Sequence, residues 1–167
     1  MKEETKQRLQ QTADGFLNIL DAVPEDRFNE KPFEKSWSAA QVAQHIFLSV
    51  RGFPKMFEMP VEKEKRDPAA HINQLRNIFT NYDSKLEAPA FIIPEDIQYN
   101  KQELINSLRK VFADTISSID KYDLNEVPEG VPFPSIGTLS RYEWLWFTIF
   151  HTERHTKQAK QIAALIA

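Results

Sequence analysis

The sequence contains no cysteine. This absence excludes disulfide bonds, thiolate metal ligands and a thiol nucleophile of the protein's own, so any metal site must use histidine, aspartate or glutamate. Glycine is also scarce, with four residues, and none of them belongs to a phosphate-binding loop of the P-loop or dinucleotide-binding kind. We therefore expect no ATP or NAD site.

The chain also lacks an excess of one charge and a long apolar run. Its 21 Lys and Arg residues nearly balance 24 Asp and Glu residues, so no basic face is indicated and nucleic acid is not an expected partner. The most apolar stretch, residues 144–150, is far shorter than the roughly 20 residues that cross a bilayer. The charged amino terminus, MKEETKQRLQ, has no apolar signal-peptide core. These features predict a cytoplasmic protein without a membrane span.

Apolar residues recur mainly at helical spacing, and no strand-like alternation of useful length occurs. The length of 167 residues and the hydrophobic content of 41% suit a single domain over residues 1–167. We predict an all-α fold, a roughly up-and-down four-helix bundle. The predicted bundle helices are 2–22, 38–51, 100–122 and 140–166.

Capping residues support these boundaries. Ser38 with Gln41, and Ser140 with Glu143, have the spacing of a capping box, and Asn100 is a third candidate N-cap. The intervening segments 24–35, 53–66, 88–98 and 123–137 are predicted as loops because they contain proline, glycine or mixed charges.

An accessory helix is expected in the long connection between the second and third bundle helices. Asp67 and Pro68 resemble an N-cap followed by proline at the first helical position. Apolar residues then keep helical spacing, and we expect the helix to pack across the outside or one end of the bundle. These positions are Ile72, Leu75, Phe79, Tyr82 and Leu86.

The candidate chemistry lies on three histidines. His151 and His155 are four residues apart on the last helix, which places both imidazoles on one face within reach of one metal ion. His45, on the second helix, completes a three-ligand face if the two helices are neighbours. The alternative is that these histidines have no metal-binding role and only pack or face solvent, because two histidines four residues apart also occur by chance.

Other polar residues near this pair receive more modest roles. His71 is expected to face water, and Glu153 falls two residues after His151, so it cannot act as the base of an HExxH protease and should pair with Lys157. Candidates to orient the imidazoles are Gln41, Thr148, Thr152 and Gln158. Core packing or a substrate wall is expected of Trp144, Trp146, Phe147 and Phe150.

Two segments carry a family resemblance. They are FNEKPFEKSWSAAQVAQHI at residues 28–46 and YEWLWFTIFHTERHTKQAKQI at residues 142–162. Together with the variable middle they resemble the DinB-like family of helical-bundle metalloenzymes. The resemblance implies a histidine triad, by position His45, His151 and His155, that binds zinc, nickel or a similar divalent ion. It also implies homodimers and, in some branches, transfer of a low-molecular-weight thiol such as bacillithiol.

Two functions remain open from the sequence. The first is a metal-dependent enzyme in which the triad activates an external thiol or water toward a small-molecule substrate. The second is a non-catalytic bundle that binds a metal ion or a small ligand in a stress response. A degenerate relative whose histidines only pack is a third interpretation.

Overall fold

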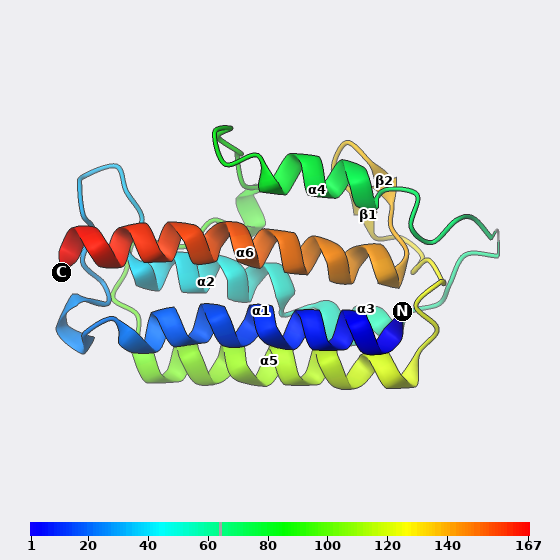
Figure 1. Cartoon of the computed structure of the whole chain (residues 1–167), viewed down its shortest axis with the longest axis horizontal. Coiled ribbons are helices and arrows are strands. Elements are labelled where there is room, and N and C mark those ends of the chain that lie inside the picture. Colours follow the sequence, from blue (N-terminus) through cyan, green and yellow to red (C-terminus); the bar gives the residue numbers. More distant parts are fainter. Residues whose placement is uncertain (64) are drawn as a thin grey trace.

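The computed structural model describes residues 1–63 and 65–167, and four long helices form its body (Figure 1). These helices are α1 (Lys2–Ala22), α2 (Ala39–Val50), α5 (Lys101–Lys121) and α6 (Arg141–Ile166). Helices α1 and α2 each pack against both α5 and α6, so each bundle helix has two neighbours. The predicted all-α four-helix bundle is confirmed.

The helices alternate in direction when the accessory helix is counted. In Figure 1, α1, α4 (Ile72–Thr80) and α6 run toward one end, and α2 and α5 run toward the other. Side chains tie the ends accordingly: Lys101 Nζ at the start of α5 donates to the Val23 carbonyl, 2.6 Å away, just after α1. Among the four bundle helices, α2 and α5 therefore run in the same direction, and the long connection between them returns the chain through α4.

The helix starts follow the predicted capping residues. Ser38 and Gln41 form a complete capping box at α2, and Ser140 and Glu143 form another at α6. At α5 the Asn100 side chain accepts a hydrogen bond from the backbone N–H of Glu103. Because a side chain here satisfies an otherwise unpaired amide, each start is fixed locally.

One apolar stripe from each bundle helix builds the core. Apolar area removed from water stabilises the fold by about 25 cal/mol per Å², so these stripes supply much of the driving force. Large, fully buried apolar side chains on the four helices include Leu9, Phe16, Leu20, Ile46, Ile105, Leu108, Ile119, Leu145 and Ile149.

The accessory helix is shorter than predicted. It begins at Ile72, because Asp67 caps a turn through the Ala69 amide at 2.9 Å instead of starting the helix. It ends at Thr80, because the side chain and carbonyl of Asn81 bind the amides of Asp83 and Ser84 in a turn that competes with helix. Tyr82 and Leu86, predicted on its apolar stripe, are 43% and 42% exposed.

Short elements also form inside the predicted loops. They are α3 (Phe53–Phe57), the 3-10 turns at Glu25–Arg27 and Ala90–Ile92, and a hairpin of β1 (Pro132–Phe133) with β2 (Gly137–Thr138). A short turn was expected in 24–35, but the elements within 53–66, 88–98 and 123–137 were not, because such short segments give no periodic signal. Within the described residues, no helix is long and apolar enough to cross a membrane.

Candidate metal centre

Three ring nitrogens meet where α2 packs against α6. His45 Nε2 lies 3.0 Å from His151 Nε2, and His155 Nε2 lies 3.1 Å from the same atom. One ligand atom from each residue lies within 4.8 Å of the others. The structure thus brings together all three histidines that the sequence singled out.

Local structure explains this convergence. The capping box at Ser38 fixes the start of α2, and His45 follows on the face that contacts α6. On α6 the spacing of four residues stacks His151 and His155 one turn apart. His45 and His151 are buried, and His155 is partly buried, which leaves its side of the cluster nearest to solvent.

The hydrogen bonds to the outer nitrogens determine two tautomers. His45 Nδ1 lies 2.8 Å from the Ile92 carbonyl oxygen, and His155 Nδ1 lies 2.7 Å from Gln158 Oε1. Because these oxygens only accept, each Nδ1 carries the hydrogen and donates it. The Nε2 atoms of both neutral rings therefore present lone pairs, and both face His151 Nε2.

The three Nε2 atoms cannot all be paired by hydrogen bonds to one another. His151 Nε2 can carry at most one hydrogen and direct it at one neighbour, so at least one of its two short contacts has no hydrogen between the two nitrogens and is repulsive. A cation among the three nitrogens would remove that repulsion. Three imidazole nitrogens, with their outer hydrogen bonds in place for two rings, are a donor set that suits zinc or nickel.

The environment keeps the rings neutral. Burial lowers the pKa of His45, against the opposing effect of its hydrogen bond to Ile92. Burial, then the charges of His155, His45 and Arg154, lower the pKa of His151 well below its usual value. Burial also lowers the pKa of His155 to about 3. Neutral imidazoles are the form that coordinates metals, so the rings are ready for a ligand role at neutral pH.

Aromatic side chains enclose the cluster. The Trp37 ring lies 5.0 Å from that of His45 and stacks on that of His155 at 6.4 Å, centre to centre. On the other side, Phe147 stacks on His151 at 5.1 Å, and Phe79 of α4 meets the same ring edge-on at 5.5 Å. These apolar walls lower the local polarity, which strengthens electrostatic interactions inside the site.

Of the predicted orienting residues, one hydrogen-bonds to the cluster and three do not. Gln158 binds His155 as expected. Gln41 instead closes the α2 capping box and binds the Glu95 carbonyl, and Thr148 binds the Trp144 carbonyl within α6. The buried Thr152 hydroxyl has no hydrogen-bond partner among the described residues.

One surface expectation was wrong in its partner. Glu153 pairs with Arg8 of α1 and not with Lys157, whose Nζ lies 4.2 Å above the Tyr82 ring. Because α1 packs on α6, Arg8 lies beside Glu153 and forms the ion pair in place of Lys157. His71 is partly buried as the N-cap residue of α4, and it is not part of the cluster.

The aromatic run of α6 serves two purposes. Phe147 touches the cluster, whereas Trp144 packs on Phe53 and Phe133, and Trp146 packs on Phe150. Three of the four residues thus fit core packing, and one fits the substrate-wall interpretation.

Two contributions to the site gave no chemical signal in the sequence. Phe79 belongs to the predicted accessory stripe, but its contact with His151 depends on where α4 docks. The Ile92 carbonyl is a backbone group in a predicted loop, and any residue type would supply it. Only the tertiary structure could assign them.

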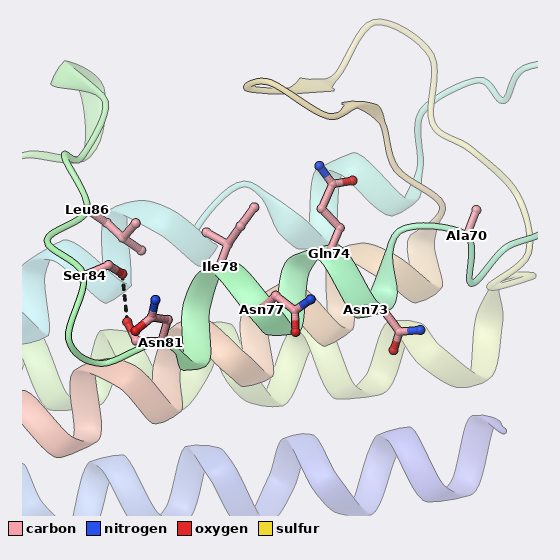
Figure 2. Close-up of a pocket in the computed structure, with 8 residues that line it drawn as sticks. All are labelled: Ala70, Asn73, Gln74, Asn77, Ile78, Asn81, Ser84 and Leu86. Atoms are coloured by element: carbon pink, nitrogen blue, oxygen red, sulfur yellow. Dashed lines mark hydrogen bonds between the residues drawn. The ribbon is translucent and has the colours of Figure 1, made fainter.

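A shallow hollow of about 690 Å³ lies on the outer side of α4 (Figure 2). Five of its eight lining residues are polar, and the full set is Ala70, Asn73, Gln74, Asn77, Ile78, Asn81, Ser84 and Leu86. None of the three clustered histidines lines it, so the hollow and the cluster are separate features.

Comparisons with known proteins agree with this architecture. The family model of the DinB superfamily matches residues 8–159. The chain is 26% identical over 149 residues to the uncharacterized protein YuaE of Bacillus subtilis (strain 168), covering 87% of this chain and 88% of that protein. The crystal structure of TT2238, a four-helix bundle protein, superposes with a TM-score of 0.60 and 18% identity, covering 96% of this chain and 99% of that one. The likeness to TT2238 is evidence for the fold alone.

Proposed function

This chain belongs to the DinB superfamily, and from that membership and its clustered histidines we propose that it binds one divalent metal ion through His45, His151 and His155. Zinc and nickel are the ions we expect. The observation that carries the proposal is the convergence of three imidazole Nε2 atoms, at 3.0 and 3.1 Å, in a buried place. Such a place is costly for unpaired polar groups without a cation.

The protein residues would prepare the ion's surroundings. The Ile92 carbonyl and Gln158 fix the ring orientations of His45 and His155, which raises their basicity as ligands. Trp37 and Phe147 exclude water from the flanks and offer an apolar surface to a substrate. When bound, a divalent ion supplies Lewis acidity that lowers the pKa of a thiol or water in its remaining coordination positions.

We propose an external thiol as the first candidate nucleophile. The chain has no cysteine, so a sulfur nucleophile must come from a second molecule. The partly buried edge of His155 beside Trp37 is the side from which a small molecule would approach. This makes the protein a metal-dependent transferase of a low-molecular-weight thiol, with hydrolysis by water as the variant reaction.

A non-catalytic bundle is the alternative function. Within the described part of the chain, no carboxylate hydrogen-bonds to any of the three rings, whose partners are Ile92, Gln158 and one another. A site without a neighbouring general base suits the storage or sensing of a metal or small ligand as well as catalysis. We also expect a homodimer, to be checked by light scattering.

Metal content tests the proposal. Protein purified with zinc or nickel should retain about one ion per chain by mass spectrometry of the metals, and His151→Ala should lose it. His71→Ala is the matched control, because that side chain lies outside the cluster. Equal metal content in wild type and His151→Ala would contradict the proposal.

A second measurement separates the two functions. Metal-loaded protein is incubated with a low-molecular-weight thiol and an electrophilic acceptor, and thiol consumption is followed with and without a chelator. Turnover that chelation abolishes supports the transferase. Stoichiometric metal binding without turnover of thiol or ester substrates supports the non-catalytic bundle.

A further inference from the structure

Helix α6 holds α4 at both ends. Near the start of α6, the fully buried Glu143 carboxylate accepts a hydrogen bond from the His71 amide at 2.7 Å and pairs with Arg66 at 2.6 Å. Farther along α6, Arg154 donates to the Asn81 carbonyl at 2.8 Å and to the Phe79 carbonyl at 3.4 Å, and its other nitrogen binds the Ser84 carbonyl. The two helices run in parallel (Figure 1).

The two charges match the polarity of α4. An acid at a helix N-terminus and a base at its C-terminus both interact favourably with the helix dipole. The spacing also fits: at about 1.5 Å per residue, the segment of α6 from Glu143 to Arg154 rises about 16 Å, and the nine residues of α4 about 14 Å. The pair therefore acts as a clamp of the same length as the helix it holds.

The C-terminal end of α4, which Arg154 holds, is the end that contacts the histidine cluster. The Phe79 carbonyl accepts from Arg154, and the Phe79 ring packs on His151 at 5.5 Å and on Phe147 at 5.1 Å. Arg154 directly precedes His155 in the chain. Fixing the carbonyls of Phe79 and Asn81 thus fixes one wall of the cluster.

We infer that Arg154 is a positioning residue that keeps the Phe79 end of α4 closed over the histidine cluster and so limits the exchange of a bound ion with solvent. The inference rests on the proposed metal site. Arg154 has no role as a ligand in it: the guanidinium acts through three backbone carbonyls and the Phe79 ring.

Arg154 affects a bound cation in two opposite ways, through its hydrogen bonds to the carbonyls at the end of α4 (its grip on α4) and through its positive charge. Loss of the grip frees α4 and speeds release, whereas loss of the positive charge favours the cation and slows release. Arg154→Gln removes both, whereas Arg154→Lys keeps the charge and part of the grip, because its single nitrogen can bind one of the carbonyls of Phe79, Asn81 and Ser84 but cannot span all three. The two variants therefore distinguish positioning from electrostatics.

The experiment measures release of cobalt(II) into excess chromophoric chelator, with the cobalt absorption spectrum as a second readout. We expect release roughly tenfold faster in Arg154→Gln, in line with the loss of a charged hydrogen bond, and faster than wild type but slower than Gln in Arg154→Lys. Arg76→Gln is the matched control, because Arg76 also bridges α4 and α6, over the Phe150 ring, yet does not bind the α4 carbonyls. It should release cobalt at the wild-type rate.

A second pair of variants tests the route through Phe79. Phe79→Leu should also speed release, and its effect should not multiply with that of Arg154→Gln, since both remove the same wall. Independent, multiplying effects would overturn the inference, as would wild-type or slower release from Arg154→Gln. If Arg154→Gln does not fold by circular dichroism, Arg154→Lys and Phe79→Leu decide the question alone. Failure of wild type to take up cobalt would instead count against the proposed function.

Discussion

His45 Nε2 and His151 Nε2 lie 3.0 Å apart although 106 positions separate the residues in the chain. No local interaction can hold two such distant groups together, so the contact depends on the packing of α2 against α6. An ion that binds these nitrogens would bind the folded state alone and stabilise it by mass action. Binding of a metal ion at the proposed site would therefore raise the stability of the fold.

Gln158 should tune metal affinity without touching the ion. Its Oε1 accepts from His155 Nδ1 at 2.7 Å, and loss of an orienting partner of a ligating histidine typically weakens binding about 10- to 100-fold. Gln158→Ala should therefore raise the zinc Kd by about that factor in a competition titration. Gln102→Ala, on α5 and bonded only to Asn106, is the control and should leave the Kd unchanged. An unchanged Kd in Gln158→Ala would remove Gln158 from the site.

The metal-free protein should lose stability as the solution is acidified. The pKa of His155 is about 3 in the folded chain, and burial also lowers the pKa of His45 and His151, against an ordinary value of 6.5. Between pH 6.5 and pH 3 the unfolded chain consequently binds more protons than the folded chain. The free energy of unfolding therefore decreases as the pH is lowered through this range. Above pH 6.5 these rings are neutral in both states and contribute no slope.

Urea unfolding at several pH values measures this effect. For His155 alone the expected loss between pH 7 and pH 5 is about 2 kcal/mol. His155→Gln should show a shallower slope over the same range because it removes one titrating group. A variant slope as steep as that of wild type would mean that His155 is not held neutral in the fold.

The capping box of α2 should stabilise the helix that carries His45. Ser38 Oγ accepts from the Gln41 amide at 3.1 Å, and Ser38 itself is buried. Ser38→Ala should lower the free energy of unfolding by about 1 kcal/mol, measured by denaturant titration of the metal-free protein. Ser107→Ala, at a partly buried position of α5 where the hydroxyl binds the Glu103 carbonyl, offers a control with a similar change of side chain. Equal effects of the two substitutions would argue against a special role for the cap.

Much of this architecture was predictable because its determinants are local. Apolar spacing and caps such as Ser38, Asn100 and Ser140 placed the four bundle helices within a residue or two of their observed ends. The histidine pair on α6 followed from helical geometry alone. His45 joined it only on the assumption that α2 and α6 are neighbours, which the structure supports.

The features that escaped prediction depend on tertiary contacts. Asp67 and Asn81 have side chains that bind nearby amides in turns, and this shortens α4 at both ends. Two basic residues, Lys157 and Arg8, could pair with Glu153, and the packing of α1 on α6 places Arg8 in contact with it. A backbone carbonyl such as that of Ile92 has no residue-type signature, so sequence pattern could not place it beside His45.

The long connection between α2 and α5 orients His45, because it contains the Ile92 carbonyl that accepts the hydrogen bond from His45 Nδ1. A shortened protein that joined the bundle helices directly would retain all three imidazoles, but the ring of His45 would be free to turn about its side-chain bonds. A rotating ligand binds more weakly, because its freedom must be lost on coordination. For the proposed metal site, the smallest portable unit would therefore be the bundle together with that peptide group, and grafting the histidines alone onto another bundle would transfer only part of it.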